Sequence, residues 1–457
     1  MSDETPTTSQ WWSLLDSLRS KGLVDPDEFA CSAALAIEGP SRWSEVKFVD
    51  SPGSESGEGT PHRLTFLQRV WTRTMERGPS SGSPGPAPST PDRSVEQLVH
   101  ASGLLRRQIV SELTERLPST SASVPALRKS LSTALSEFDL RPSRAEADLT
   151  LYRGPADLCR AVLETLGVSS GTIYLPCITD RRQAAIAAGL ASQAVVQGPT
   201  HQQVLRGALV LALAGVDCRW SIEDALQHPV LESGRLRAFD ATLIVPPIGK
   251  RGAYSKPESL LLDPRPEYPV NDRTTSEFLY LIHAVESTDP TNGVVLAVLP
   301  DSVLFKGGPL SRIRSFLVRR SPLVLTHVVS MPTPFAGTGV AASIVVLQRA
   351  APDRKMRFID AQPFVEGRGD RARYDTGAIV RLLQAGESEP GVVAVTPADE
   401  VLQDEVSWDV RRYIKPKEVE TLMPRDARRA AMEARETRAK AEDTLVRSLE
   451  ELSGAVS

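Results

Sequence analysis

Cysteine is scarce in this chain of 457 residues, and the four that occur are scattered. They are Cys31, Cys159, Cys177 and Cys218. None forms a C-x-x-C pair, and the six histidines show no H-E-x-x-H or comparable ligand spacing. The sequence therefore supports neither a disulfide framework nor a metal site, and we expect the cysteines to be buried thiols.

Long apolar runs and an excess of positive charge are also missing. No stretch reaches the roughly 18 apolar residues that a membrane span needs, and the opening "MSDETPTTSQWW" lacks the basic and apolar regions of a signal peptide. We therefore expect a cytoplasmic protein with no membrane partner. The formal net charge of −4 provides no general attraction to nucleic acid, so any such contact must come from local basic patches or from a partner subunit.

The first 150 residues alternate helical patterns with segments rich in Ser, Pro and Gly. Apolar residues recur at helical spacing over 11–37 with a break at 22–26, which indicates a helical hairpin. Segments 51–62 and 77–94 contain almost no apolar residue, so we expect exposed or disordered insertions there. Residues 1–150 are accordingly interpreted as an N-terminal helical domain.

The sequence pattern changes near residue 155, where apolar segments typical of strands begin to alternate with amphipathic segments typical of helices. This alternation predicts an α/β domain over 151–352, with a mostly parallel sheet covered on both faces. In such sheets ligands bind outside the carboxyl ends of the strands. The loops expected there are 176–182, 197–201, 222–226, 245–252 and 300–308.

Two further parts follow the α/β domain. Residues 353–424 read as a mixed tail. The last segment, 425–457, is rich in Ala, Arg and Glu and carries a modest apolar stripe, which predicts a long C-terminal helix. That helix either folds back on its own chain as a solvated element or docks on another subunit.

A continuous family resemblance covers 277–349. This stretch reads "EFLYLIHAVESTDPTNGVVLAVLPDSVLFKGGPLSRIRSFLVRRSPLVLTHVVSMPTPFAGTGVAASIVVLQR". It resembles the adenine-N6 DNA methylases, specifically the modification subunit of type I restriction-modification systems. Weaker matches are "WSLLDSLRSKGLVDPDEF" near the N-terminus and "SWDVRRYI" at 407–414. The resemblance implies a Rossmann-like class I methyltransferase sheet, S-adenosylmethionine as cofactor and DNA as substrate.

The first cofactor element that the resemblance implies is altered in this chain. In the family a glycine-rich turn follows the first strand, where a side chain would displace the methionine part of the cofactor. Here the strand and turn read "IYLPCITDRRQ", which keeps Pro176 but has Leu175 in place of an acid and contains no glycine. Arg181 and Arg182 should obstruct the sulfonium cofactor and repel its positive charge.

The second cofactor element is altered as well. The family carries an acidic residue after the second strand to accept the ribose hydroxyls, whereas this chain has Gly198, Pro199 and Thr200. Asp224 matches an acidic residue of the third loop, near the cofactor's adenine, or else caps a helix. The degenerate cofactor-binding positions are Pro176, Thr179, Asp180, Thr200 and Asp224.

The catalytic loop that the resemblance implies is Asn-Pro-Pro followed by an aromatic residue. In the family the Asn side chain and the first Pro carbonyl accept hydrogen bonds from the adenine amine, and the ring stacks on the flipped base. The corresponding residues here are Val245, Pro246, Pro247 and Ile248. The prolines keep the direction of the loop, but Val245 offers no acceptor and Ile248 no aromatic face. Losing the acceptor should reduce the rate of methyl transfer by orders of magnitude.

Basic residues cluster in two regions that face the DNA cleft in the family. The candidates are Lys250, Arg251 and Lys256 after the Pro-Pro turn, and Lys306, Arg312 and Arg314 around the later helix. They form either a nucleic-acid contact or an ordinary solvated surface.

Three hypotheses follow from these observations. The first is a pseudo-methyltransferase without a cofactor, acting as a binding or assembly subunit. Its protein partner is a specificity-type subunit, an active methylase or other enzyme, or a second copy of itself, with DNA as a further partner. The second is an active S-adenosylmethionine-dependent adenine methyltransferase with unusual motifs. The third is a methyltransferase fold that holds a different, anionic ligand at Arg181 and Arg182.

Overall fold

The computed structural model describes most of the chain between residues 150 and 416 and shorter stretches on either side. The described residues are 6–20, 26–38, 110, 113–114, 123–137, 150–254, 260–319, 321–336, 338–350, 354–403, 406–416, 432–433, 435–436, 438 and 440. The chain forms two compact units, Met1–Lys415 and Pro416–Ser457. The insertions expected at 51–62 and 77–94 lie outside the described residues.

Three helices near the N-terminus pack around an aromatic pair. They are α1 (Thr8–Ser20), α2 (Pro26–Glu38) and α6 (Val124–Glu137). The rings of Trp11 and Phe29 are fully buried and meet edge to face, with centroids 6.4 Å apart. Trp11 Nε1 also donates a 2.9 Å hydrogen bond to Ser130 Oγ on α6. The pair therefore joins the predicted hairpin, α1 and α2, to α6.

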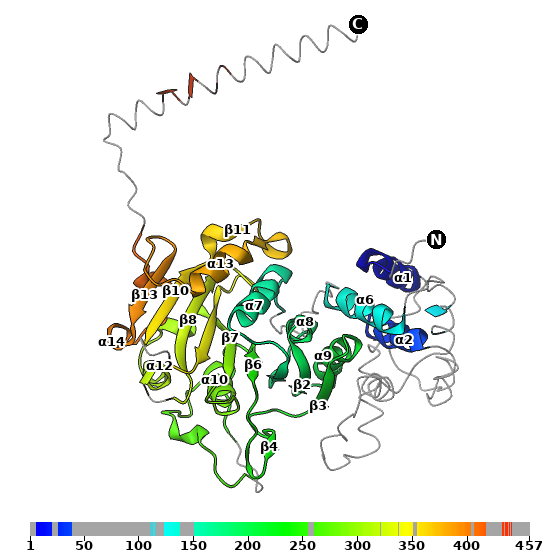
Figure 1. Ribbon diagram of the computed structural model, residues 1–457, viewed down its shortest axis with the longest axis horizontal. Coiled ribbons are helices and arrows are strands. Elements are labelled where there is room, and N and C mark those ends of the chain that lie inside the picture. The colour runs from blue at the N-terminus through cyan, green and yellow to red at the C-terminus, as the bar shows by residue number, and fades with distance from the viewer. Residues whose placement is uncertain are drawn as a thin grey trace, which may run out of the picture. The chain divides into compact units, whose positions relative to one another are not determined.

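Within the described residues a nine-stranded sheet forms the centre of the first unit (Figure 1). Its strand order is β13-β10-β8-β9-β7-β6-β1-β2-β3. The strands are β1 (Gly171–Leu175), β2 (Ala191–Gln197), β3 (Asp217–Ser221), β6 (Ala241–Ile244), β7 (Val294–Pro300), β8 (Val324–Met331), β9 (Ala342–Gln348), β10 (Lys355–Asp360) and β13 (Val393–Pro397).

The strand order creates a topological switch point between β1 and β6. From β1 the chain moves outward to β2 and β3, then returns to add β6 on the other side of β1, and all four strands run parallel. β7 continues parallel to β6. The carboxyl ends of these strands therefore share one edge of the sheet, called the carboxyl edge below. A ligand site is expected there because the loops diverge at the switch point.

Helices cover both faces of the sheet. On β7, Val294, Leu296 and Val298 belong to one core cluster and Val295, Ala297 and Leu299 to the other. The first face is covered by α7 (Arg153–Thr165), α8 (Arg181–Ala188) and α9 (His201–Leu213), and the second by α10 (Ser276–Glu286) and α12 (Pro309–Arg319). This arrangement confirms the α/β fold class that the alternating apolar pattern predicts.

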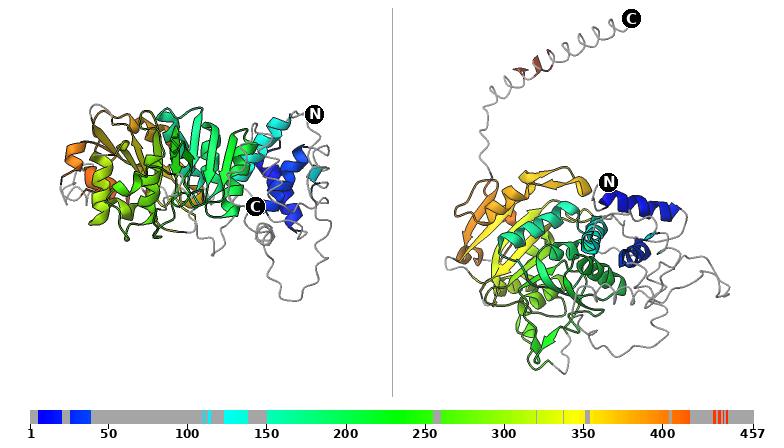
Figure 2. Two further views of the ribbon diagram at one scale, coloured as in Figure 1. Left: turned by 90° about the horizontal axis from the view of Figure 1, so that it is seen from below. Right: turned by 45° about the vertical axis from the view of Figure 1, so that its right-hand side comes forward.

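The N-terminal helices lie against this layer. α6 packs on α8 and α9, and Ser132 Oγ on α6 donates a 2.8 Å hydrogen bond to the carbonyl of Val210 on α9. Figure 2 shows the N-terminal helices beside these two helices from two further sides.

The sheet extends beyond residue 352. β10 pairs in parallel with β8, and β13 pairs antiparallel with β10, so strands of the mixed tail belong to the sheet of the α/β domain. The shorter elements are α11 (Asp301–Phe305), α13 (Thr376–Leu383), α14 (Ala398–Val401), α15 (Val410–Tyr413) and two hairpins, β4 (Leu231–Glu232) with β5 (Arg235–Leu236) and β11 (Val365–Glu366) with β12 (Arg373–Tyr374).

The second unit is described at only a few positions. Residues 432–433, 435–436, 438 and 440 are helical and exposed. None of the helices in the described part of the chain is long and apolar enough to cross a membrane. Among the same residues no group of His, Cys, Asp and Glu is arranged to hold a metal ion. The four cysteines are free and buried, as predicted.

Candidate functional site at the carboxyl edge

The turn after β1 is filled by its own side chains. Ile178 is 1% exposed and belongs to the main core cluster. A Cβ placed on Gly207 of α9 would come within 2.0 Å of Ile178 Cδ1, so the glycine leaves the space that the isoleucine occupies. Pro176 and Cys177 are buried too. Burial raises the pKa of the Cys177 thiol, which keeps it protonated. The glycine that leaves space beside this turn is therefore Gly207 of α9, and the side chain of Ile178 fills that space.

Thr179 and Asp180 directly precede α8. Asp180 is the N-cap, and its Oδ1 accepts the Gln183 backbone N–H at 3.0 Å. The Gln183 side chain forms two hydrogen bonds with Thr179. Its Oε1 accepts the Thr179 backbone N–H at 3.0 Å, and its Nε2 donates to the Thr179 hydroxyl at 2.9 Å. Burial raises the pKa of Asp180, although the hydrogen bond from the Gln183 backbone N–H and the charge of Arg182 oppose the shift. Both candidate cofactor residues are therefore engaged in capping the helix.

Asp180 also ties this turn to the segment before α7. Its Oδ2 accepts the Leu151 backbone N–H at 2.9 Å, and Arg182 donates to the Leu151 carbonyl. Leu151 in turn forms an antiparallel bridge with Phe335, which follows β8. Leu151 and Phe335 are completely buried in the same cluster as Ile178. Leu151 therefore joins the segments that follow β1 and β8, through its backbone hydrogen bonds and through its burial in the shared core cluster.

Arg181 and Arg182 do not project into the turn as cations facing solvent. They are only 7% and 8% exposed, because both lie in the first turn of α8 beneath neighbouring helices. The side chain that fills the space beside this turn is Ile178, and Arg182 is held by the Leu151 carbonyl.

β2 ends at Gln197, whose side chain is a buried amide. Gln197 is 2% exposed, and its Nε2 donates to Ser221 Oγ and to the carbonyl of His228, both at 3.0 Å. Its Oε1 accepts the hydroxyl of Tyr174 on β1. The last residue of β2 is thus fully engaged inside the protein. Thr200 caps α9 by accepting the Gln203 N–H at 3.4 Å.

Asp224 caps a turn. Its Oδ1 accepts the Leu226 backbone N–H at 2.9 Å and the Tyr280 hydroxyl at 2.8 Å. Its backbone carbonyl accepts the N–H groups of Gln227 and His228. Of the two roles considered for this aspartate, the structure shows capping, of a short turn that no α-helix follows among the described residues.

The Pro-Pro loop follows β6 at the switch point. Val245 is 1% exposed, and Pro246 is buried beside it. Pro247 and Ile248 are half-buried, and Ile248 packs against the main core cluster. The side chain of Val245 therefore presents no polar atom, and it points into the protein.

The start of α10 holds this loop in place. Ser276 Oγ donates a 2.7 Å hydrogen bond to the Pro247 carbonyl, and the Ser276 N–H donates to the Lys250 carbonyl at 2.8 Å. Gly249, with a φ of +68°, donates its N–H to Glu277 Oε1 at 2.7 Å. The positive φ lets the chain turn back toward the helix, a conformation that glycine adopts without strain. Loop and helix thus form one hydrogen-bonded assembly.

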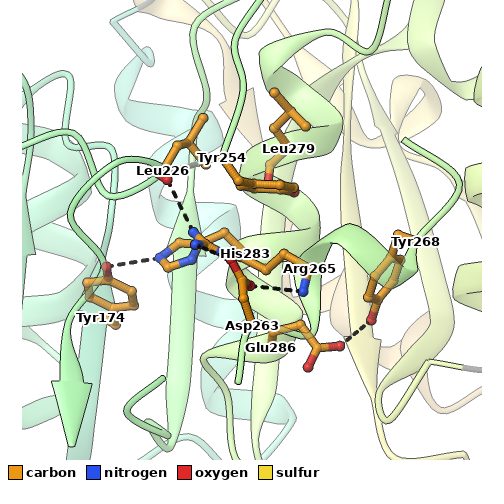
Figure 3. A network of polar contacts seen from close by, with 9 residues as sticks. All are labelled: Tyr174, Leu226, Tyr254, Asp263, Arg265, Tyr268, Leu279, His283 and Glu286. Carbon is orange, nitrogen blue, oxygen red and sulfur yellow. Dashed lines mark hydrogen bonds and ion pairs between the residues drawn. The ribbon is translucent and has the colours of Figure 1, made fainter. Parts of the chain in front are cut away.

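A buried network of polar side chains braces the adjoining loops (Figure 3). Arg265 is fully buried and forms a two-pronged ion pair with Asp263, with two N–O distances of 2.8 Å. Its third nitrogen donates to the Leu226 carbonyl at 3.3 Å, and its guanidinium lies 4.6 Å from the centre of the Tyr254 ring. Arg265 thereby fastens the connection after β6 to the turn after β3.

The same view shows His283 of α10 beside Tyr174, with 3.1 Å between Nε2 and the hydroxyl oxygen (Figure 3). His283 is fully buried. Its pKa falls to about 3, because burial and the charge of Arg265 both disfavour the imidazolium. A neutral histidine therefore links α10 to the Gln197 network. Tyr268 donates a 2.5 Å hydrogen bond to Glu286 at the far end of the same helix.

The predicted basic residues separate into two groups. Lys250, Arg251, Lys306 and Arg312 are exposed. Arg314 is not: it is 0% exposed and donates to the carbonyls of Val406 at 2.8 Å, Val303 at 2.7 Å and Lys306 at 2.5 Å. This corrects the expectation that Arg314 is a nucleic-acid contact, because its guanidinium is occupied inside the protein. Lys256 lies outside the described residues.

Comparison with known proteins agrees with the sequence resemblance. Residues 207–421 match the family model of the N-6 DNA methylases. The methyltransferase subunit of a type I restriction-modification system from Streptococcus thermophilus has a TM-score of 0.61 at 16% identity, covering 90% of this chain and 100% of that one. The chain is similar to the N-6 DNA methylases over residues 207–421, and it shares the fold of this methyltransferase subunit.

Two other solved structures share the fold. One is a chain from a structure of type I restriction-modification assembly and conformational transition, with a TM-score of 0.58 at 14% identity over 98% of this chain and 99% of that one. The other is a modification subunit assigned to a type I restriction enzyme of Vibrio vulnificus, with a TM-score of 0.58 at 15% identity over 90% and 98%. These likenesses place the N-6 DNA methylase-like sheet in the class I methyltransferase fold, as predicted.

Several residues of this methylase-like site were not anticipated from the sequence. Ser276 and Glu277 hold the Pro-Pro loop, and the Tyr174, Arg265 and His283 network braces the sheet. The stretch "TTSEF" before an apolar helix is a recognisable start signal and could have identified the first two. The network joins positions far apart in sequence, so no local pattern identifies it.

Proposed function

We propose that this chain is a non-catalytic subunit with a methyltransferase fold, serving binding or assembly in a DNA-modification complex. The observation that carries the proposal is the buried apolar side chain of Val245, at the position that the sequence resemblance matches to the asparagine of the N-6 DNA methylases. Methyl transfer to adenine needs an acceptor there to orient and polarise the amine. A valine in the core supplies none.

The carboxyl edge also lacks a fit for S-adenosylmethionine. The turn after β1 contains Ile178 packed against Gly207 in place of a glycine-lined space. β2 ends at Gln197, whose amide is bonded to Tyr174 and Ser221. Gly198, Pro199 and Thr200 follow, and none of them offers a carboxylate for the ribose. We infer that the cofactor is not held, and we derive no chemical step through it.

Assembly is supported by the kind of proteins that share the fold. The similar chains include one from a structure of type I restriction-modification complex assembly, matched over 98% of this chain. The expected partner is accordingly a specificity-type subunit, an active methylase or other enzyme, or a second copy, with the predicted C-terminal helix as the docking element. The proposed location is the cytoplasm.

Methyl transfer and co-purification together test the proposal. Full-length protein, incubated with radiolabelled S-adenosylmethionine and a DNA library, should transfer no label above a heat-treated control. Tagged protein purified from its native host should elute as a complex larger than the monomer. Label on adenine would establish the active-methylase alternative, and elution as an isolated monomer would contradict the assembly role.

DNA remains a proposed partner through the exposed basic residues. Lys250 and Arg251 lie on the loop after β6, at the carboxyl edge. Lys250→Glu with Arg251→Glu should weaken duplex binding by the purified complex and reduce its dependence on salt, because fewer counterions are released. Arg235→Glu, on the exposed β5, is the matched control. Unchanged binding by the double variant would remove this loop from the DNA contact.

A further inference from the structure

A cavity of about 270 Å³ lies where α6 of the N-terminal helices meets α7, α8 and the end of α9. It is lined by Lys129, Ser132, Thr133, Arg153, Ala156, Asp157, Arg160, Arg182, Ala185, Ile186, Ala188, Gly189 and Ala214. The lining runs along α8 from Arg182 to the C-cap Gly189. The cavity therefore lies on the flank of α8, whereas the Pro-Pro loop follows β6 at the carboxyl edge.

Positive charge dominates the lining. Lys129, Arg153, Arg160 and Arg182 contribute cations, and Asp157 contributes the one carboxylate among the lining residues. Asp157 is shared, lying 3.7 Å from Arg153 Nε and 3.3 Å from Arg160 Nη2. A concave surface with more cations than carboxylates attracts anions and holds them more strongly than a flat one.

The cations differ in burial: Arg182 lies inside the protein, whereas Lys129 is exposed and the side chains of Arg153 and Arg160 are 65% and 45% exposed. Arg182 is 8% exposed, and its guanidinium is oriented by a hydrogen bond to the Leu151 carbonyl. A Cβ on Gly189 would lie 3.2 Å from Arg160 Cδ, so this glycine gives room for the arginine to lie across the end of α8. The alanines of the lining, Ala156, Ala185 and Ala188, leave the volume open. The site is thus built from α6, α7 and α8, with Ala214 at the end of α9.

We propose that this cavity binds a small phosphorylated ligand of nucleotide size. Arginines and a lysine converging on one cavity suit a phosphate group, which accepts several charge-assisted hydrogen bonds at once. The volume lies just below the range of about 300–1,000 Å³ that is usual for small-molecule sites, and it is larger than a lone phosphate requires. The alanines and Ile186 provide an apolar wall for the rest of the ligand. Because Lys129 comes from α6, the bound ligand joins the N-terminal helices to the α/β sheet.

Calorimetric titration of the full chain at low salt tests the proposal with three probes: ATP, inorganic phosphate and a short DNA duplex. ATP should bind at least tenfold more tightly than inorganic phosphate. Lys129→Glu with Arg160→Glu should weaken ATP binding at least tenfold, since two of the four cations are reversed. Arg235→Glu, an equal charge reversal on exposed β5, should bind ATP as the unmodified chain does.

A second variant tests whether ATP binding needs the volume of the cavity as well as its positive charge. Ala188→Phe keeps every charge and fills the cavity, so it should also abolish ATP binding, and thermal melting should show that each variant is folded. Absence of ATP binding by the unmodified chain at millimolar concentration would overturn the proposal, as would unchanged affinity in the charge-reversed variant. Binding of the duplex without binding of ATP would also overturn it, by assigning the cations to a DNA surface. None of these outcomes depends on whether S-adenosylmethionine binds.

Discussion

The carboxylate of Asp180 accepts the backbone N–H of Leu151 at 2.9 Å, and this bond joins the turn after β1 to the segment that precedes α7. The same carboxylate caps α8 through Gln183, and Arg182 donates to the Leu151 carbonyl. Asp180, which the sequence resemblance makes a candidate cofactor residue, is engaged in hydrogen bonds within the scaffold. These hydrogen bonds hold the turn after β1 against the segment before α7.

Asp180→Ala should destabilise the fold by about 2–4 kcal/mol, because it leaves two buried backbone donors without acceptors. Asp157→Ala is the control: that carboxylate also sits beside arginines, but its side chain is 44% exposed, so the loss should stay below about 1 kcal/mol. Urea denaturation measures both. Equal losses for the two variants would show that the Leu151 bond does not stabilise the turn.

Gly207→Ala should destabilise the protein by about 1–3 kcal/mol, since the added methyl group would lie 2.0 Å from Ile178 Cδ1. Ile178→Val removes that terminal methyl group. The double variant should therefore regain stability relative to Gly207→Ala alone, which denaturation of the four proteins in a thermodynamic cycle would measure. Simple additivity would mean that Ile178 does not occupy the space beside α9.

Arg314→Ala should cost about 3 kcal/mol or more of stability, because three carbonyls lose a buried charged donor. The neighbouring Arg312→Ala, exposed on the same helix, should change stability by less than about 0.5 kcal/mol. If the two variants unfold at the same urea concentration, the internal role assigned to Arg314 is wrong.

Stability should fall as the pH drops below about 6.5. His283 and His327 are buried and neutral, with pKa values lowered by burial to about 3 and about 4. The unfolded chain takes up protons near pH 6.5 and the folded chain does not, so at pH 5 each histidine removes about 2 kcal/mol of stability. His283→Gln should flatten the pH dependence between pH 7.5 and 5 by that amount. His228→Gln, at an exposed position, should leave it unchanged.

The sheet could largely be predicted from the sequence, and its edges could not. The continuous apolar run of β7 identifies a strand buried on both faces. β3, "DCRWS", lies at the edge of the sheet and mixes charged and apolar residues, so its pattern does not predict a strand. β10 and β13 join the sheet only through pairing with β8 and with each other, which no local pattern reveals.

The site shows the same division. The substitutions at Val245 and Ile248 are readable from the motif alone, and the structure adds where those side chains lie. The burial of Arg314 depends on Val406, 92 positions away, so its helix alone suggested an exposed cation. The cavity beside α8 depends on α6 packing against it, and the intervening sequence carries no sign of that contact.

Calorimetric titration of S-adenosylmethionine into the full chain tests the central claim most directly. We predict no binding at ligand concentrations up to about 1 mM, since a dissociation constant above that value corresponds to less than about 4 kcal/mol of binding free energy. Saturable binding with a micromolar dissociation constant would contradict the account, because it would require the carboxyl edge to hold the cofactor despite Ile178, Gln197 and Val245.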